Sequence, residues 1–311
     1  MSDVSRVITV FGGSGFIGRH LVWRLARTGA RIRIACRSPN RAAFLKTLGE
    51  VGQIVPFATD IADEASVARA VEGASTVVNL IGILFESTRW KFANVQAEAP
   101  GRIAAAARAA GATRLVHISA IGADAKSPSE YARTKAAGEM AVLDAFPTAT
   151  ILRPSIVFGP EDNFFNQFAT IACLSPVLPL FGGGQTRFQP VFVGDVADAI
   201  MACLNTPATQ GKTYELGGPK VYSFRDLMKL TLSTIQRCRL LMPVPWPVAS
   251  ALARVMELLP APMLTRDQVT LLRQDNVVAK GALRLSDLGL TPTPAEIILP
   301  GYLTRFRRYG K

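Results

Sequence analysis

A glycine-rich turn close to the amino terminus constrains the fold of this chain more than any other feature. An apolar run over residues 7–11 leads into Gly12, Gly15 and Gly18, and an amphipathic segment over residues 19–28 follows. This order predicts a strand, a phosphate-binding loop and a helix. Gly12 is expected to make the tight turn, Gly15 to admit a pyrophosphate, and Gly18 to let the helix pack closely on the strand.

The same glycines also fit a spacing that begins at Gly13 instead of Gly12. A glycine triplet alone is typical of many ordinary loops, and the flanking strand and helix patterns make dinucleotide binding the better interpretation. Ser14, Phe16 and Ile17, which lie between or beside the glycines, are therefore expected to contact the cofactor as well.

The end of the second predicted strand indicates which dinucleotide binds. In NAD-binding units an acidic residue at this place holds the ribose 2′-hydroxyl. Here the strand over residues 31–37 ends in Arg37, and Arg41 follows one helical turn later. A guanidinium group at this point favours a 2′-phosphate, so the sequence predicts NADP(H) over NAD(H), although a solvated basic loop would look the same.

Strands and helices alternate along the first half of the chain. Further strands are predicted over residues 53–58, 76–82, 114–119 and 150–157, with helices over residues 100–111 and 129–144. This alternation predicts an α/β fold with a doubly wound parallel Rossmann sheet and a smaller C-terminal lobe. Ligands of such sheets lie beyond the carboxyl ends of the strands. The cofactor-binding residues expected there are Asp60 and Ile61 beside the adenine, Leu80, Ile81 and Gly82 along the phosphates and nicotinamide ribose, and Pro154.

A segment beyond the sixth strand is expected to return to the sheet. Residues 1–160 with residues 187–205 should form the nucleotide-binding domain, and residues 161–186 with 206–311 the smaller lobe. The net charge of +12 is concentrated in that lobe, because residues 220–311 carry fourteen Lys and Arg against six Asp and Glu. The smaller lobe is therefore expected to contact a substrate or an acidic partner.

A second constellation lies on the helix predicted after the fifth strand. Tyr131 and Lys135 are four residues apart and share one helix face, so the ammonium group can favour the phenolate and also reach a ribose hydroxyl. This pair is suited to acid/base chemistry at a carbonyl. An exposed helix face would show the same spacing by chance, but its position after the fifth strand favours the functional interpretation.

Several classes of protein are disfavoured by composition. Four scattered cysteines and two histidines, His20 and His117, indicate neither a disulfide framework nor a metal site. The longest apolar stretch, residues 240–253, is too short to span a membrane and contains three prolines, although mean hydropathy is high at +0.24. The first strand begins so early that no signal peptide is expected, which favours a cytosolic face and a prokaryotic source.

The C-terminal lobe carries two features suited to an interface. A helix starting at Pro247 places apolar residues on one face, and it could close the lobe, cover a groove or lie on a membrane surface. The apolar face comprises Val248, Ala251, Leu252, Val255 and Leu259. Residues 302–311 mix aromatic residues with Arg305, Arg307, Arg308 and Lys311, which suits anionic lipid headgroups or an acidic protein.

Together these motifs resemble the short-chain dehydrogenase/reductase superfamily in its extended branch. Five further segments resemble, within it, the atypical family of nucleotide-binding accessory subunits of respiratory complex I, the alpha-subcomplex subunit nine family. Those segments are residues 117–124, 152–159, 189–197, 264–269 together with 275–278, and 300–308. The resemblance implies tightly bound NADPH, partners among the complex I subunits, and a stabilising role near the membrane junction, peripheral on the cytoplasmic face of the inner membrane.

One departure from the superfamily pattern bears on catalysis. Active members place a Ser or Thr just past the fifth strand, whereas here Ser119 comes slightly too early and Ala120 follows. Loss of one such hydrogen-bond donor lowers rates by about two to three orders of magnitude. The pattern therefore favours a retained binding site, with Tyr131 and Lys135 as a vestigial pair, unless Ser127 or Ser129 substitutes.

Three interpretations remain open from the sequence. The first is a cofactor-bearing structural subunit of complex I. The second is a working NADPH-dependent reductase, or a nucleotide-sugar epimerase or dehydratase, in which Arg153 or Arg187 meets substrate phosphates. The third is an RNA-binding scaffold, and it is the poorest because the basic residues belong to no nucleic-acid fold signature. No nucleic-acid partner is expected.

Overall fold

The chain divides into two compact units. In the computed structural model, residues 6–259 and 262–308 are described. The first unit holds the chain up to Arg153, with Val196–Tyr214 and Asp287–Leu290; the second holds Pro154–Asp195, Glu215–Ser286 and the chain from Thr291 onward. The expected returning segment began at residue 187, but residues 187–195 lie in the second unit, where Val191 and Phe192 pair with a strand of that unit.

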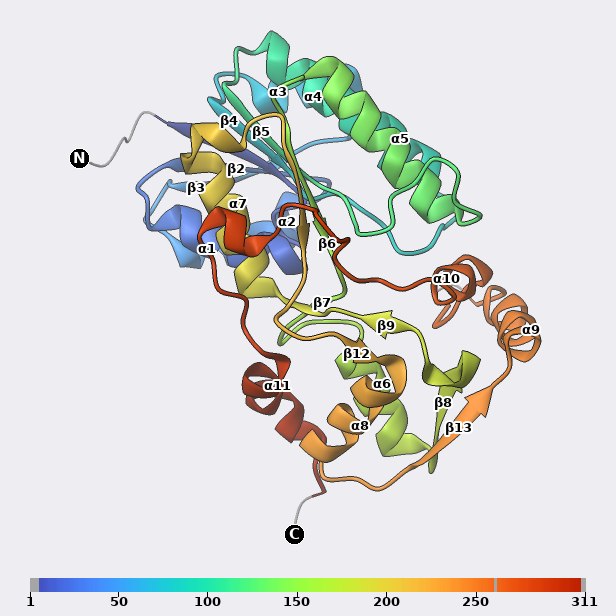
Figure 1. Ribbon diagram of the computed structural model, residues 1–311. Coiled ribbons are helices and arrows are strands. Elements are labelled where there is room, and N and C mark those ends of the chain that lie inside the picture. The colour runs from blue at the N-terminus through green and yellow to red at the C-terminus, as the bar shows by residue number, and fades with distance from the viewer. Residues whose placement is uncertain (1–5, 260–261, 309–311) are drawn as a thin grey trace. The chain divides into compact units, whose positions relative to one another are not determined.

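A seven-stranded sheet forms the centre of the first unit, in the order β11-β6-β5-β4-β1-β2-β3 (Figure 1). The pairs from β1 to β6 are parallel. The strands are β1 Val7–Phe11, β2 Arg31–Cys36, β3 Ile54–Ala58, β4 Thr76–Asn79, β5 Arg114–Ile118, β6 Thr150–Pro154 and β11 Thr213–Leu216. The predicted doubly wound α/β sheet is thus confirmed, and the strand order reverses between β1 and β4, where such sheets bind ligands.

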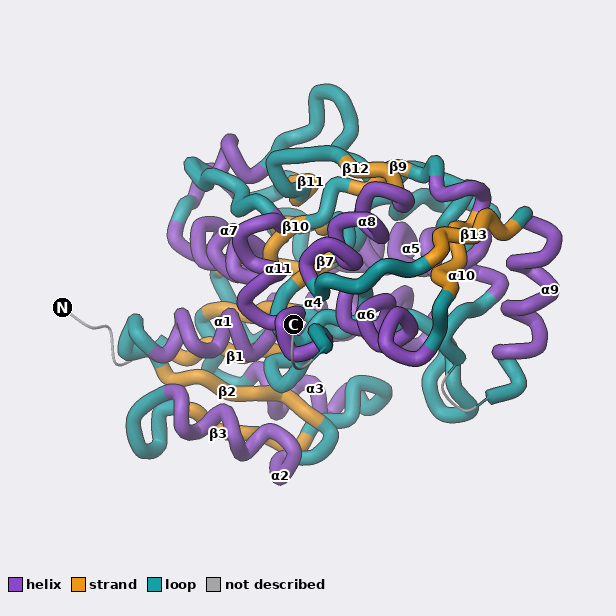
Figure 2. The backbone as a smooth tube through the Cα atoms, turned by 90° about the horizontal axis from the view of Figure 1, so that it is seen from below, coloured by secondary structure: helices purple, strands orange, loops and turns teal. Residues whose placement is uncertain are grey.

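Helices cover both faces of this sheet, as βαβ units require. They are α1 Phe16–Ala26, α2 Pro39–Ala42, α3 Glu64–Val71, α4 Ala99–Ala109, α5 Glu130–Ala145 and α7 Val193–Asn205, with a π-helical segment Ala93–Glu98 before α4. Strands β1, β2 and β3 run side by side in Figure 2. Strand β4 ends at Asn79, three residues before its expected end, because the Asn79 side chain accepts from the Ile81 amide and turns the chain out of the sheet.

The second unit is built from short strand pairs and helices around an aromatic core. Its strands are β7 Val157–Phe158 with β10 Val191–Phe192, β8 Val177–Phe181 with β13 Leu240–Val244, and β9 Arg187–Phe188 with β12 Tyr222–Ser223. Its helices are α6 Phe165–Leu174, α8 Phe224–Thr234, α9 Trp246–Met256, α10 Arg266–Leu271 and α11 Ala295–Leu303. The ring of Phe164 meets those of Phe165, Phe168, Phe188 and Phe224, which fill the centre of this unit.

Short 3-10 turns complete the two units. They are Ala43–Leu48, Gly182–Gly184, Pro207–Thr209, Leu285–Leu288 and Thr304–Phe306. No helix within residues 6–259 and 262–308 is long and apolar enough to cross a membrane.

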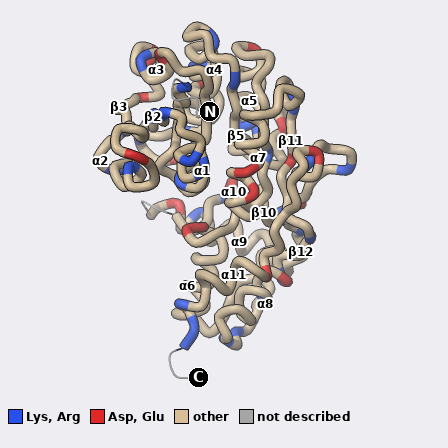
Figure 3. Tube along the Cα trace, turned by 90° about the vertical axis from the view of Figure 1, so that its left-hand side faces the viewer, with Lys and Arg blue, Asp and Glu red and all other residues tan. Residues whose placement is uncertain are grey.

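The predicted basic tail begins inside the core of the second unit. Tyr302 and Leu303 are buried, and the Tyr302 hydroxyl donates to the buried carboxylate of Asp162. Arg305 then binds the Asn166 side chain, and Arg307 donates to the Thr234 carbonyl. Residues 302–307 are thus tied to the second unit by these contacts, whereas Lys311 lies outside the described residues. Figure 3 marks this basic segment in blue beside the C-terminal end.

Candidate nucleotide-binding site

Three glycines of the amino-terminal turn are constrained by the fold itself. Gly12 has a φ of +76°, which L side chains rarely adopt. A Cβ on Gly18 would lie 2.5 Å from the Gly12 carbonyl oxygen, so a side chain there would push α1 away from the turn. A Cβ on Gly13 would meet the Ile34 side chain at 3.0 Å. These positions let the chain pass from β1 into α1 within four residues.

Gly15 is less constrained by the fold than these three glycines. Its φ is −78°, and a Cβ would meet only the Gly12 carbonyl oxygen, at 3.2 Å. Gly15 is exposed and precedes α1, which begins without a side-chain cap on its first amides. Partly buried Ser14, Phe16 and Ile17 surround this opening. An open backbone beside unpaired helix amides fits the pyrophosphate of a dinucleotide.

The ends of β2 and β3 lie side by side beyond this turn. The Thr59 amide donates to the Cys36 carbonyl, which places exposed Arg37 near the loop of Asp60 and Ile61. Asp60 accepts from the Ala62 amide, so its carboxylate serves its own loop. Arg37 makes no ion pair with a carboxylate of the described residues; its guanidinium carbon lies 4.7 Å from the ring centre of Trp90.

Lys135 lies against the loop that follows β4. A Cβ on Gly82 would come within 3.1 Å of Lys135 Nζ, and this ammonium group donates to the Ile118 carbonyl at 3.3 Å. Burial lowers the pKa of Lys135 to about 8, although the charge of Glu139 partly offsets it. Tyr131, one turn earlier on α5, contacts the ring of Phe92 edge-on. The structure thus brings Gly82 and Lys135 together, with Tyr131 one turn earlier on the same helix.

Two buried polar side chains beneath this site were not among the predicted residues. Asn79 is the last residue of the apolar strand β4 and His117 is the next-to-last residue of β5, and a polar residue near a strand end was the available signal. Asn79 Nδ2 lies 3.1 Å from His117 Nδ1. Since Asn79 Oδ1 accepts from the Ile81 amide, Asn79 is assigned as the donor to a neutral His117. Desolvation lowers the pKa of His117 to about 3, so the ring stays neutral at physiological pH.

Serines near the site have mainly local roles. Ser119 is buried, and its Oγ has no hydrogen-bond partner among the described residues, while Ala120 occupies the position expected for a catalytic hydroxyl. Ser127 Oγ accepts from the Ser129 amide, and Ser129 caps α5 by accepting from the Ala132 amide. Both possible substitutes for the missing donor therefore serve the turn before α5.

The two arginines expected to meet substrate phosphates are already bound to carboxylates. Arg153 forms a bidentate pair with Glu139, at 2.8 and 2.6 Å, and this pair is largely buried. Arg187 binds Asp275 at 2.8 Å through Nε. The sequence did not predict these ion pairs, because each carboxylate lies far from its arginine along the chain. Pro154 ends β6 and belongs to the second unit, so it is not among the residues that the first unit brings together.

Metal ligands are not gathered in the part of the chain that the structure describes. Within residues 6–259 and 262–308, no group of three or more His, Cys, Asp and Glu side chains could hold a metal ion. Cys36, Cys173, Cys203 and Cys238 are all free thiols.

Comparison with known proteins shows which family this chain matches. A family model described as the NAD dependent epimerase/dehydratase family matches residues 8–217. NADH dehydrogenase (ubiquinone) 1 alpha subcomplex subunit 9 of Arabidopsis thaliana is 37% identical over 99% of this chain and 80% of its own length. The Rattus norvegicus protein of that name is 36% identical over 99% of this chain and 82% of its own length.

This chain is also similar to an enzyme and to a solved structure. A ceramide reductase of Caulobacter vibrioides is 34% identical over 66% of this chain and 63% of its own length. The structure of a dTDP-glucose 4,6-dehydratase from Streptomyces venezuelae, with NAD bound, matches with a TM-score of 0.71 over 96% of both chains at 19% identity. At that identity the likeness concerns the fold alone.

Proposed function

This chain belongs to the NAD-dependent epimerase/dehydratase family and, within it, resembles complex I subunit 9 along almost its whole length; from this premise we propose that it is an NADPH-binding accessory subunit of respiratory complex I. Its role is to stabilise the complex near the membrane junction, with little or no turnover. It is peripheral on the inner membrane, and the cytoplasmic face of a prokaryotic cell is the position we infer.

The observation that carries this proposal is a set of residues suited to a dinucleotide, without the hydroxyl group that catalysis would need at Ala120. The opening at Gly15, the exposed guanidinium group of Arg37 and the ammonium group of Lys135 beside Gly82 suit pyrophosphate, 2′-phosphate and ribose respectively. When bound, NADPH would supply a hydride to a carbonyl. At Ala120, however, the chain offers no hydroxyl to polarise that carbonyl, which favours a cofactor held for stability.

Tyr131→Phe tests the non-catalytic role. The ring and its edge contact with Phe92 persist in this variant, so NADPH content and assembly into complex I are expected to stay within about twofold of wild type. Both are measured on complex I purified from cells carrying either version. Loss of an NADPH-dependent turnover in Tyr131→Phe, with assembly unchanged, would contradict the proposal.

Helix α9 supports a contact with the membrane surface. Its small residues Ala249 and Ala253 face the core of the second unit, while Val248, Leu252 and Val255 are exposed. The apolar face predicted from the sequence is therefore turned outward, where it is available to a partner. Exposed Arg254 lies on the same helix, and apolar residues next to basic ones are typical of helices that lie in a lipid interface.

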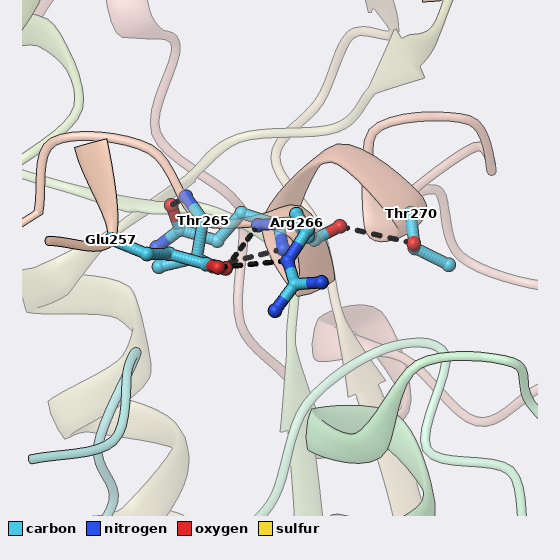
Figure 4. Close-up of polar contacts among 5 residues, drawn as sticks. Glu257, Thr265, Arg266 and Thr270 are labelled. Carbon is cyan, nitrogen blue, oxygen red and sulfur yellow. Dashed lines mark hydrogen bonds and ion pairs between the residues drawn. The ribbon is translucent and has the colours of Figure 1, made fainter. Parts of the chain in front are cut away.

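The end of α9 is fixed to the start of α10, as Figure 4 shows. Glu257 accepts from the Arg266 amide at 2.7 Å and pairs with Arg266 Nε at 2.8 Å. Thr265 caps α10 in a reciprocal capping box with Gln268. Between these anchored ends Leu258, Leu259 and Met263 are exposed, and they extend the apolar surface of α9. We propose that this surface rests on lipid headgroups.

Sedimentation with vesicles of phosphatidylcholine and phosphatidylglycerol tests the membrane contact. Leu252→Asp with Val255→Asp is expected to lower the bound fraction of the full chain about tenfold or more, because each lost apolar contact is worth about 1 kcal/mol or more. Val51→Asp, at an exposed apolar position of the first unit, is the matched control. Equal binding of all three proteins would refute the contact.

A second candidate function is favoured by the pair of Tyr131 and Lys135. We infer that this chain, if it is an active reductase, uses Tyr131 as the proton donor. Lys135, whose pKa is lowered by burial, would then orient the ribose. The similarity to a ceramide reductase supports a carbonyl substrate in that case. Turnover of NADPH with a keto-lipid substrate, lost in Tyr131→Phe, would establish this candidate.

A further inference from the structure

The loop between β4 and the helical segment at Ala93 carries two residues that no sequence motif singled out. Arg89 and Trp90 lie in this loop, and Trp90 is fixed in place. The Ser87 amide donates to the Trp90 carbonyl at 2.9 Å, and the Trp90 amide donates to Ser87 Oγ at 3.2 Å. The ring of Trp90 is partly buried and packs on the core of the first unit, as Ile81 and Ile83 also do.

Further contacts hold both ends of the loop. Buried Gln96 donates to the Ile83 carbonyl at 2.8 Å. Glu86 accepts from the Phe92 amide at 2.8 Å and pairs with Lys91 at 3.1 Å, so the carboxylate of this loop is already neutralised. The indole of Trp90 is thus held by the protein before any ligand arrives.

Two guanidinium groups meet at this indole. The Arg37 guanidinium carbon lies 4.7 Å from the ring centre, and that of Arg89 lies 5.2 Å from it. Both arginines are exposed, and neither forms an ion pair with a carboxylate of residues 6–259 or 262–308. Two cations within about 10 Å of each other repel, and an anion between them would relieve that repulsion.

We propose that Trp90 and Arg89 complete, with Arg37, the pocket for the 2′-phosphate of NADPH. The inference rests on the proposed function and names residues that would select its cofactor. Arg37 directly follows β2, at the place where the ribose 2′ group lies in such folds. The contact with Trp90 holds the planar guanidinium group of Arg37 in one orientation, which lowers the conformational entropy that this side chain loses when it binds a phosphate. Arg89, from the loop after β4, adds a second guanidinium group whose N–H donors can bind the same phosphate.

Two nucleotides that differ only in the 2′-phosphate test this pocket. The purified full chain is titrated calorimetrically with 2′,5′-ADP and with 5′-AMP. Wild type is expected to bind 2′,5′-ADP more tightly, and Arg37→Asp to lose that preference. Arg89→Gln and Trp90→Leu should each weaken 2′,5′-ADP about tenfold and leave 5′-AMP within about twofold, since exposed charge-assisted contacts to a phosphate are worth about 1.4 kcal/mol.

Trp23→Leu is the matched control, because the ring of Trp23 also contacts an arginine. The guanidinium carbon of Arg27 lies 3.5 Å from the centre of that ring. Trp23 lies on α1, away from the turn at Gly15 by more than two helical turns. This variant is expected to bind both nucleotides as wild type does. A loss of preference in Trp23→Leu equal to that in Trp90→Leu would overturn the pocket.

The remaining outcomes separate the pocket from the proposed function. If wild type prefers 2′,5′-ADP while Arg89→Gln and Trp90→Leu keep that preference, the pocket is wrong and NADPH binding stands. If wild type binds the two nucleotides equally, both ideas fail. If Trp90→Leu weakens both nucleotides alike, Trp90 acts on the fold and is no part of the pocket. Quenching of Trp90 by 2′,5′-ADP in the Trp23→Phe/Trp246→Phe variant would support the pocket, and unchanged emission would overturn it.

Discussion

Replacing Gly15 with valine is expected to leave the chain folded and free of NADPH. A Cβ at this position would meet only the Gly12 carbonyl oxygen, at 3.2 Å, and the backbone φ of −78° is open to any residue. The added methyl groups would instead fill the opening before α1, where the pyrophosphate approaches the helix amides. A cofactor bound only by the folded state adds about 3 kcal/mol of stability at a hundredfold excess over its Kd. The variant should therefore melt at a lower temperature in NADPH.

Gly301→Val is the control for Gly15→Val. Gly301 is exposed on α11, and a Cβ there would meet nothing within 4 Å. Its NADPH content and its gain in melting temperature on adding NADPH should equal those of wild type. Stoichiometric NADPH in purified Gly15→Val would show that the turn is not the cofactor site.

Replacing Lys135 with methionine is expected to stabilise the protein without nucleotide and to weaken NADPH binding. The pKa of Lys135 is lowered from 10.5 to about 8 by burial, so the folded state binds this proton less well than the unfolded state. Below pH 8 both states are protonated, and burial of the charge costs about 3 kcal/mol in wild type. Between pH 8 and 10.5 the unfolded chain binds more protons, so wild type gains stability as pH rises.

Urea unfolding at several pH values measures this effect. The excess free energy of unfolding of Lys135→Met over wild type should be largest at pH 7 and should shrink by pH 9.5. Lys126→Met, at an exposed position, should show no such dependence. A Lys135→Met variant that is less stable than wild type at pH 7 would show that the ammonium group serves the fold and is not held for a ligand.

Residues next to one another in the chain were the most predictable. Gly12 and Gly18 have the roles expected from their spacing, because a positive φ and a close helix approach are local requirements of a strand-turn-helix unit. The parallel sheet followed from the alternation of strands and helices. Strand β4 was predicted too long, since the bond from the Ile81 amide to the Asn79 side chain that ends it leaves no mark in the pattern of apolar residues.

Contacts between distant segments could not be predicted from the sequence. Arg153 was predicted to bind a substrate phosphate, but the fold places Glu139 of α5 beside it, and the two form an ion pair. Trp90 and Arg37 are more than fifty residues apart and meet only once β4 is placed beside β1. The charges of the basic ending are visible in the sequence, whereas the partner of Tyr302 is not, because Asp162 lies 140 positions earlier.

We have proposed that this chain is a complex I subunit that holds NADPH. Purification of the native protein from its own membranes, with native gel migration and nucleotide analysis of the same sample, tests it most directly. We expect the chain to migrate with NADH:quinone oxidoreductase activity and to release about one NADPH per chain on denaturation. A chain that migrates alone as a soluble protein, or one that is in the complex without NADP(H), would contradict this proposal.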